Sequence, residues 1–203
     1  MKPYLFFKQT ADFFFAALLI VILSPVLFII SAIIKLDSKG PVLFKQKRIG
    51  KSNIEFDIYK FRTMRTDTPK DVPTHMFRDA ESYITAIGKF LRKSSLDELP
   101  QLFNIIQGKM SFIGPRPALW NQFDLIKARN ALGVETLKPG ITGWAQVNGR
   151  DELPIKVKAE LDGFYKDHCS LIFDIKILFL TFINVISQRG VVEGGPDKKK
   201  KQS

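Results

Sequence analysis

An apolar run of 22 residues near the N-terminus, residues 13–34, constrains this chain more than any other feature of its sequence. Nineteen of these residues are apolar, and only Ser24, Pro25 and Ser31 interrupt them. As one straight helix the run measures about 33 Å, enough to cross the hydrocarbon core of a bilayer. It is too long for a secretory signal peptide, and no small-residue cleavage site follows it. A buried helix of a soluble domain is the other reading.

Two details favour a re-entrant helix over a straight span. Ser24 and Pro25 stand at the midpoint of the run, where proline removes a backbone donor and predicts a break. Positive residues flank the run on both sides: Lys2 and Lys8 precede it, and six lysines and arginines follow between residues 35 and 51. Because positive residues favour the cytoplasmic face, we expect a helix–break–helix that enters and leaves by that face.

The remaining sequence predicts an α+β fold. Residues 42–48 and 54–61 read as strands of a small β-hairpin around a turn at 50–53, while 66–79 and 138–150 read as loops. Helical patterns cover 84–93, 102–107, 118–132, 155–168 and 171–187. We expect amphipathic helices at the membrane interface. The last helix is very apolar but contains Asp174, Lys176 and Asn184, so it either lies flat on the bilayer or is a buried core helix. These patterns divide the chain into a membrane helix (1–36), a catalytic domain (37–188) and a flexible basic tail (189–203).

The net charge is +11, and the four lysines at 198–201 account for only part of it. Such an excess points to an anionic partner: nucleic acid, a phosphorylated substrate or anionic lipid. Cys169 is the only cysteine, and the two histidines, His75 and His168, lie far apart. A thiolate cluster and a histidine-based zinc site are therefore not expected, and any metal should be a hard cation held by oxygen.

Asp97 and Glu98 are adjacent carboxylates within a basic region that includes Arg92 and Arg116. A carboxylate among cations stays ionised, so it serves as a nucleophile or a magnesium ligand. The alternative is helix capping, because Ser94-x-x-Asp97 and Ser95-x-x-Glu98 both match a capping box. Pro100 complicates capping, since a helix that starts before it would contain a proline in its second turn.

Two other basic segments are candidate phosphate sites. Residues 114–117, Gly-Pro-Arg-Pro, hold Arg116 between two prolines, and a fixed guanidinium fork suits a phosphate. Lys60 and Arg62 share one face if their segment is extended, so they are expected to meet an anion together. The alternatives without a binding role are a rigid surface turn for 114–117 and a solvated strand face for Lys60 and Arg62. The chain has no GxxxxGK[ST] loop and no GxGxxG motif, so an ordinary P-loop or Rossmann nucleotide site is not indicated.

Four motifs strongly resemble those of the monotopic phosphoglycosyl transferases, the initiating sugar transferases of bacterial glycoconjugate pathways. They are Ser-Leu-Asp-Glu-Leu-Pro-Gln-Leu at 95–102, Met-Ser-Phe-Ile-Gly-Pro-Arg-Pro at 110–117, Ile-Tyr-Lys-Phe-Arg-Thr-Met at 58–64, and Lys-Pro-Gly-Ile-Thr-Gly-Trp-Ala-Gln-Val-Asn-Gly-Arg at 138–150. The resemblance covers residues 13 to about 188, with the motifs in the family's order. The chain matches the minimal form of the family, without the extra N-terminal membrane helices of longer relatives, and is expected to be a complete catalytic unit.

The resemblance implies a reaction and roles for particular residues. A UDP-sugar, which we expect to carry an N-acetylated hexosamine with the 6-deoxy form included, gives its sugar-1-phosphate to polyprenyl (undecaprenyl) phosphate, and UMP leaves. Asp97 is implied as the nucleophile that forms a covalent phospho-sugar intermediate, and Glu98 as the ligand of Mg²⁺. Arg92 and Arg116 match positions that bind phosphate or nucleotide, as do Gln146 and Arg150. The family's helix break matches Ser24-Pro25.

The resemblance further implies a location and partners. We expect a monotopic protein of the bacterial inner membrane with its catalytic domain on the cytoplasmic face, at the first membrane step of capsule, O-antigen or glycoprotein glycan assembly. Anionic lipids, downstream glycosyltransferases and a second copy of the chain are further candidate partners. A non-catalytic scaffold bound to anionic lipid is the competing hypothesis. Nucleic acid is not expected, because no recognisable binding module is present.

Overall fold

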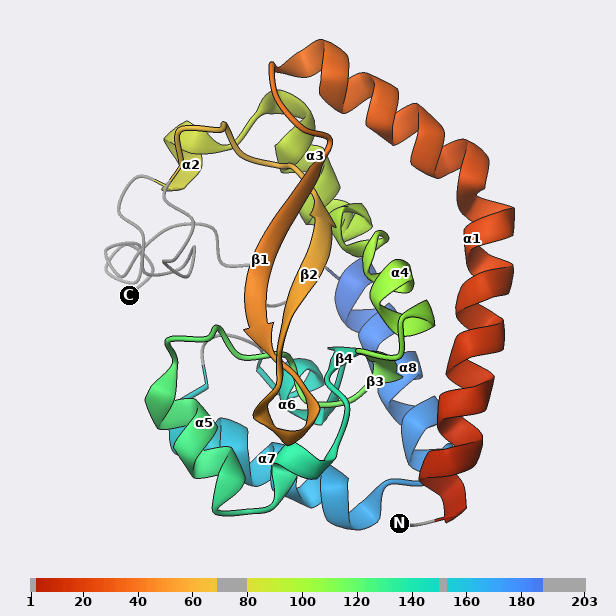
Figure 1. Ribbon diagram of the computed structural model, residues 1–203, viewed down its shortest axis with the longest axis vertical. Coiled ribbons are helices and arrows are strands. Elements are labelled where there is room, and N and C mark those ends of the chain that lie inside the picture. Colours follow the sequence, from red (N-terminus) through yellow and green to blue (C-terminus); the bar gives the residue numbers. More distant parts are fainter. Residues whose placement is uncertain (1–2, 69–79, 150–152, 188–203) are drawn as a thin grey trace.

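The computed structural model describes residues 3–68, 80–149 and 153–187 (Figure 1). It has the expected α+β architecture: a long N-terminal helix, an antiparallel hairpin and several further helices. The elements that position the candidate site are, in chain order, α1 (Pro3–Asp37), β1 (Leu43–Ile49), β2 (Glu55–Phe61), α3 (Ala86–Ser94), the 3-10 helix η3 (Leu96–Glu98), α4 (Gln101–Ile106), β3 (Ser111–Ile113), α5 (Phe123–Asn130), β4 (Gly140–Thr142), α6 (Trp144–Val147), α7 (Ile155–His168) and α8 (Leu171–Ile186).

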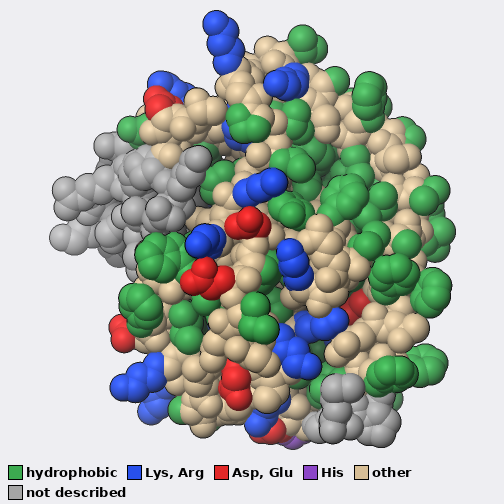
Figure 2. Space-filling model, viewed as in Figure 1, with side chains coloured by type: hydrophobic (Ala, Val, Ile, Leu, Met, Phe, Trp, Pro, Cys, Tyr) green, Lys and Arg blue, Asp and Glu red, His purple; other side chains and the backbone are tan. Residues whose placement is uncertain are grey.

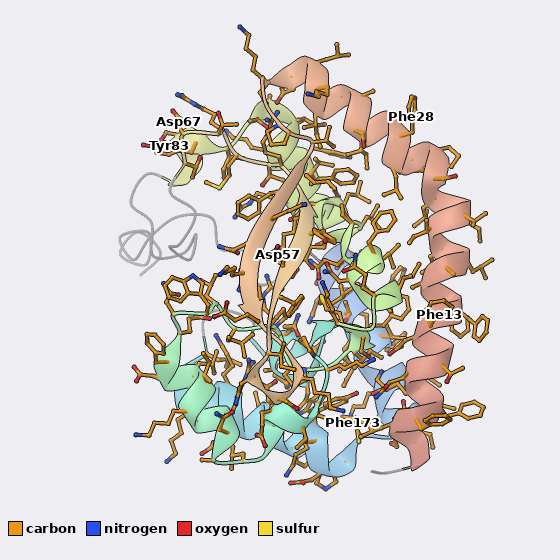
Figure 3. All side chains as sticks on the ribbon, in the orientation of Figure 1. Phe13, Phe28, Asp57, Asp67, Tyr83 and Phe173 are labelled. Atoms are coloured by element: carbon orange, nitrogen blue, oxygen red, sulfur yellow. The ribbon has the colours of Figure 1, made fainter. Side chains whose placement is uncertain are left out.

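Helix α1 is continuous through the expected break, with Pro25 inside it. Its axis nevertheless changes direction between Phe13 and Phe28 (Figures 1 and 3). Pro25 has no N–H to donate to the carbonyl of Val21, and the hydroxyl of Ser24 donates to that carbonyl instead, at 2.8 Å. The Ser-Pro pair thus produces a bend in which the freed carbonyl keeps a partner.

The outer surface of α1 is apolar and exposed. Among the described residues, the stretch Tyr4–Asp37 is long and apolar enough to cross a membrane. An 18-residue window within it has a mean hydropathy of 3.0, and only 11% of that window is buried. Figure 2 shows hydrophobic side chains gathered along the edge of the molecule that α1 forms. Length and composition therefore make α1 a membrane-associated element.

A polar stripe fixes the first half of α1 to the rest of the chain. Tyr4, Lys8 and Asp12 are spaced four residues apart and so lie on one helix face. The Tyr4 hydroxyl and the Lys8 ammonium each donate to Oδ2 of Asp174 in α8 at 2.6 Å, and the Ser111 hydroxyl donates to Asp12 at 2.6 Å. The first half of α1 is therefore held beside β3 and α8 by polar contacts as well as by packing.

The hairpin forms as predicted, with β1 and β2 antiparallel from Leu43↔Phe61 to Ile49↔Glu55 around a turn at Lys51–Asn53. Phe56 and Ile58 alternate along β2 and are buried against Leu102 and Ile105 of α4. Ala16 of α1 belongs to the same core cluster. The hairpin, α4 and the membrane-associated helix therefore share one hydrophobic core.

The strand pair β3–β4 was not expected from the sequence. The two three-residue strands are parallel, with Ser111 opposite Gly140 and Ile113 opposite Thr142. A side chain at Gly140 would place Cβ 2.1 Å from the backbone nitrogen of Gly114, so only glycine permits this approach. The expected loop at 138–150 is thus wrong over β4 and α6.

The predicted helix at 118–132 is also too long. Helix α5 begins only at Phe123, because Ala118 accepts a hydrogen bond from Ile49 and Leu119 bridges to Arg48 at the edge of the hairpin. The four other predicted helices are confirmed as α3, α4, α7 and α8 to within two residues at each end. The predicted loop at 66–79 lies mostly, and the tail at 189–203 wholly, outside the described residues.

Helix α8 combines the two readings that its sequence allowed. Ile177 and Asp174 are buried against the core, whereas its other face exposes large apolar side chains. These are Leu171, Ile172, Ile175, Leu178, Phe179, Phe182, Ile183 and Ile186. One face of α8 therefore belongs to the core, and the other is a surface of the kind that suits a bilayer interface.

Candidate active site

The carboxylates of Asp97 and Glu98 lie in a single 3-10 turn between α3 and α4. Ser95 adopts a left-handed conformation (φ 58°) that ends α3 and redirects the chain into this turn. Helix α4 then begins directly after Pro100, as proline at a helix start favours. The capping-box alternative is not realised: the Ser95 side chain caps nothing, and the Ser94 hydroxyl donates backward to Phe90 and Leu91.

Two segments that are distant in the sequence bring cations to this turn. The Lys60 ammonium lies 2.6 Å from Oε1 of Glu98 and 3.6 Å from Oδ2 of Asp97. Arg116 reaches the same Glu98 oxygen with Nη1 at 3.5 Å. Lys60 comes from β2 and Arg116 from the 114–117 segment, so the structure gathers these predicted residues from three parts of the chain. The cluster is partly open, since the Lys60 and Glu98 side chains are 19% and 18% exposed.

Asp97 is the most buried member of the cluster, at 8% exposure. Burial raises the pKa of its carboxyl above the ordinary value, and the charge of Glu98 adds to this, whereas Lys60, Arg92 and Arg116 lower the pKa. The sequence shows only the cations around Asp97. In the structure, desolvation is the larger effect, so Asp97 is a poorly hydrated carboxylate whose charge is sustained by its basic neighbours.

Asn104 fixes the position of Lys60 relative to the acidic turn. Its side chain is fully buried, accepts a 3.0 Å hydrogen bond from the N–H of Tyr59 and donates a 2.7 Å bond to the carbonyl of Asp57. Asn104 thereby joins α4 to β2 on both sides of one peptide segment. This role is not visible in the sequence, because an asparagine inside a helical pattern carries no sign of its long-range partner.

The carbonyls around Arg116 are each held by a donor. Arg129 donates through Nη1 to the carbonyl of Arg116 at 2.8 Å, and Arg48 donates to that of Pro117 at 3.0 Å. Gly140 N–H donates to Pro115 at 3.0 Å. Two prolines already restrict this backbone, so the added hydrogen bonds leave the Arg116 side chain on a fixed support.

Arg129 is itself held by a buried ion pair with Asp162 of α7. Its Nε and Nη2 both reach Oδ2 of Asp162, at 2.9 and 2.6 Å. Burial raises the pKa of Asp162, and the charge of Arg129 opposes that rise. Neither residue was singled out from the sequence. A charged residue facing the buried side of a helical pattern is the signal that marks such pairs.

Arg62 does not join the site, and the expectation that it meets an anion together with Lys60 is not supported by its position. Its buried guanidinium donates to the carbonyls of Ser38 (2.6 Å) and Lys39 (2.9 Å) at the end of α1. The physical reason is that β2 ends at Phe61, so the alternation that would have placed Lys60 and Arg62 on one face stops between them. Arg62 instead satisfies carbonyls beyond the last turn of α1.

The other predicted residues are placed as follows. Arg92 stands in the last turn of α3 and acts on Asp97 electrostatically. Gln146 lies in α6 and donates to the Ile141 carbonyl at 2.8 Å, while its buried Oε1 has no partner among the described residues. That oxygen can accept a bond from a ligand or a water. Arg150 lies outside the described residues.

The side chains near Asp97 can be compared with the ligands that the expected Mg²⁺ ion requires. Within the part of the chain that the structure describes, no group of three or more His, Cys, Asp or Glu side chains gathers in metal-binding geometry. Mg²⁺, however, is usually bound by one or two carboxylates together with substrate phosphates and water. The carboxylates of the neighbouring residues Asp97 and Glu98 fit that mode, with the substrate supplying the remaining ligands.

Comparison with known proteins matches the family model described as "Bacterial sugar transferase" over residues 3–188. The chain is 40% identical over 184 residues to the "Uncharacterized sugar transferase EpsL" of Bacillus subtilis (strain 168), covering 91% of this chain and 89% of that protein. It is 39% identical over 181 residues to the "UDP-glucose:undecaprenyl-phosphate glucose-1-phosphate transferase" of Escherichia coli (strain K12), covering 86% of this chain and 39% of that protein.

A third relative has a different sugar in its name. It is the "UDP-N-acetylgalactosamine-undecaprenyl-phosphate N-acetylgalactosaminephosphotransferase" of Aeromonas hydrophila, 37% identical over 193 residues, covering 92% of this chain and 45% of that protein. The chain therefore spans less than half the length of the Escherichia coli and Aeromonas hydrophila relatives.

Proposed function

The chain belongs to the family of bacterial sugar transferases, and on this basis we propose that it moves a sugar-1-phosphate from a UDP-sugar to polyprenyl phosphate. The observation that carries the proposal is the Asp97–Glu98 turn, where two carboxylates lie among Lys60, Arg92 and Arg116. Phosphoryl transfer depends mainly on positioning and on cations that neutralise the developing charge. The names of the relatives support the reaction class.

In the proposed first step, a carboxylate oxygen of Asp97 attacks the β-phosphorus of the UDP-sugar. A bond forms between that oxygen and phosphorus, the bond from phosphorus to the bridging oxygen breaks, and UMP leaves with the electron pair. The sugar phosphate is then attached to Asp97 as an acyl phosphate. Partial burial leaves the Asp97 oxygen weakly hydrated, which favours its attack.

In the proposed second step, a phosphate oxygen of polyprenyl phosphate attacks the same phosphorus. The Asp97–phosphorus bond breaks, the carboxylate is restored, and polyprenyl-diphosphate-sugar leaves. Lys60 and Arg116 supply positive charge to the phosphoryl oxygens in both steps. A Mg²⁺ ion held by Glu98 would supply further neutralisation of the diphosphate.

The location of the site supports a reaction between a soluble donor and a lipid acceptor. Asp97 lies directly before α4, and α4 packs against the membrane-associated helix α1. We propose that the protein is monotopic and sits on the cytoplasmic face of the inner membrane. There the nucleotide sugar arrives from solution and the polyprenyl phosphate from the bilayer.

The transferred sugar is a narrower proposal. We propose an N-acetylated hexosamine, in which the 6-deoxy form is included. The relatives' names include both glucose and N-acetylgalactosamine, so they support a UDP-sugar donor without selecting one. A panel of UDP-sugars scored for UMP release in the presence of undecaprenyl phosphate identifies the donor, and release with UDP-glucose alone would contradict this narrower proposal.

The decisive test compares Asp97→Asn with Asp57→Asn, an exposed carboxylate on the same strand as Lys60. We expect Asp97→Asn to lower turnover by at least roughly a thousandfold, as loss of a nucleophile does in other enzymes. Donor labelled at the β-phosphorus should leave label on the wild-type and Asp57→Asn proteins and none on Asp97→Asn. UMP release should also fall when the metal is chelated. Wild-type turnover in Asp97→Asn would contradict the role of Asp97. The absence of UMP release from the wild type with any UDP-sugar would favour the lipid-binding scaffold instead.

A further inference from the structure

A cleft separate from the Asp97 site lies between the first half of α1 and the end of α4 with the segment that follows it. Its volume is about 370 Å³. Phe6, Thr10 and Phe13 form the α1 wall, and their spacing of three and four residues places them on one helix face. Ile106 and Met110 belong to the opposite wall. The cleft is therefore lined mainly by apolar side chains from two elements that are far apart in the sequence.

One cation stands in this apolar cleft, the half-buried Lys138. The Lys138 ammonium lies beside Gly108, because a Cβ atom built on that glycine would be 3.7 Å from it. Among the described residues, no carboxylate forms an ion pair with Lys138. Burial lowers the pKa of this lysine, and the charge of Lys51 lowers it further, while Asp12 acts in the opposite direction.

The cleft has apolar walls, and its cation, Lys138, has no carboxylate in an ion pair among the described residues. These two features indicate which kind of ligand the cleft can bind. A poorly solvated ammonium is stabilised by an anion, and the charge of Lys51 adds to that attraction. Phe6 and Phe13 are 66% and 44% exposed, so the cleft opens onto the apolar outer surface of α1 that Figure 2 shows. A ligand that satisfies both features has an anionic head and apolar chains.

We propose that this cleft binds one acidic glycerophospholipid of the surrounding membrane, with its phosphate beside Lys138 and its acyl chains along Phe6 and Phe13. The choice of this lipid over the acceptor rests on the proposed function. The acceptor's phosphate has to reach Asp97, and none of Asp97, Glu98, Lys60 or Arg116 lines the cleft. A phosphate held at Lys138 therefore belongs to a second lipid.

The test uses the full chain in phosphatidylcholine nanodiscs with and without phosphatidylglycerol. Native mass spectrometry then counts the phosphatidylglycerol molecules that the protein retains on release from the disc. Lys138→Gln removes the cation, and Thr10→Trp fills the cleft while keeping the charge. The exposed Lys109→Gln, a lysine of the same region that does not line the cleft, is the matched control.

We expect Lys138→Gln to weaken phosphatidylglycerol retention by roughly fivefold, the typical contribution of one lysine near an anionic lipid surface. Thr10→Trp should weaken it comparably, and Lys109→Gln should resemble the wild type. Equal losses in Lys138→Gln and Lys109→Gln, or no loss in either cleft variant, would overturn the proposal. So would unchanged retention together with a raised KM for undecaprenyl phosphate, because the cleft would then hold the acceptor.

Retention is measured without donor or turnover, so it reports on the cleft even if the wild-type chain releases no UMP from any UDP-sugar. That result would contradict the proposed function alone. Normal UMP release with no phosphatidylglycerol retained by the wild type would contradict the lipid site alone.

Discussion

Arg129 and Asp162 form a buried ion pair, with Nη2 2.6 Å from Oδ2, and the same guanidinium donates a 2.8 Å bond to the carbonyl of Arg116. The pair joins α5 to α7 and supports the segment that presents Arg116 to Glu98. The position of a charge in the candidate site therefore depends on two helices that supply no residue to the Asp97–Glu98 turn. Arg129 is a positioning residue in this arrangement.

Replacing Arg129 should affect both stability and donor binding. Arg129→Ala leaves Asp162 buried without its partner, and breaking a buried pair in this way costs about 3–5 kcal/mol. Arg129→Lys keeps a charge for Asp162 but lacks the planar fork that also reaches the Arg116 carbonyl. We expect Arg129→Lys to raise the KM for the UDP-sugar more than it lowers kcat, while the unfolding midpoint stays near that of the wild type.

Steady-state kinetics and denaturant unfolding check this prediction. Lys127→Ala, an exposed lysine on the same helix, is the control and should change stability by no more than about 0.5 kcal/mol. Arg129→Lys with wild-type kinetics would mean that the bond to Arg116 does not position that side chain.

Lys60 and Arg62 are two residues apart, but replacing each by glutamine should have a different effect. The Lys60 variant should lose turnover, and the Arg62 variant should lose stability. Lys60→Gln removes the cation nearest Glu98 and should lower turnover strongly while leaving thermal stability almost unchanged. Arg62→Gln leaves carbonyls at the end of α1 without their donor and should cost roughly 3 kcal/mol of stability. Its kcat, measured below the unfolding transition, should remain within a few fold of the wild type.

Turnover and thermal unfolding of the two variants, measured in parallel, separate the two roles. A loss of turnover without a loss of stability in Arg62→Gln would restore Arg62 to the phosphate site that the sequence predicted for it.

The contrast between Lys60 and Arg62 shows what the sequence determines here and what it does not. Local patterns were sufficient for the hairpin and for α4, because each depends on neighbours along the chain. The side chain of Arg62 depends on carbonyls 23 and 24 residues away in the sequence. The sequence pattern around Arg62 gives no indication of this contact.

The β3–β4 strand pair was not predicted for the same reason: it depends on a contact between segments that are distant in the sequence. Ser111 and Gly140 are each part of a three-residue strand, too short for an alternating pattern to be recognised. Their pairing depends on the absence of a side chain at Gly140, which brings two backbones together across 29 residues of sequence. The sequence predicts a loop at 138–150, although Gly140 there permits the close approach of two backbones.

The pH dependence of turnover should reflect the raised pKa of the buried Asp97 carboxyl. Burial raises the pKa of this carboxyl, and the reaction requires its ionised form. Turnover should therefore fall on acidification at a pH above the ordinary aspartate value of about 3.9. Because Lys60 lowers this pKa, Lys60→Gln should move the acid limb of kcat/KM to higher pH.

The measurement is kcat/KM against pH for the wild type, Lys60→Gln and the exposed-lysine control Lys109→Gln. The control should keep the wild-type acid limb. A limb that moves to lower pH in Lys60→Gln would show that Lys60 does not stabilise the charged form of the carboxylate on which turnover depends.

The bend in α1 leads to a prediction about membrane topology. Pro25 removes the donor to Val21, and Ser24 replaces it with a hydroxyl. Pro25→Ala returns the backbone donor and favours a straight helix by about 3 kcal/mol. Two anchors oppose straightening through the bilayer, because Tyr4 and Lys8 both bond to Asp174 on the side of the catalytic domain. The wild-type N-terminus should therefore lie on the same side of the membrane as that domain.

The single buried cysteine makes the topology measurable. In a Cys169→Ser background, Lys2→Cys reports on the N-terminus and Lys109→Cys on the catalytic domain, each probed with an impermeant maleimide in oriented vesicles. Both should react from the same side in the wild-type sequence. Pro25→Ala should relocate Lys2→Cys in only a minor fraction of molecules, and adding Lys8→Leu should enlarge that fraction because one anchor and one positive flanking charge are lost. Labelling from opposite sides in the wild-type sequence would mean that α1 spans the bilayer and that the bend does not turn it back.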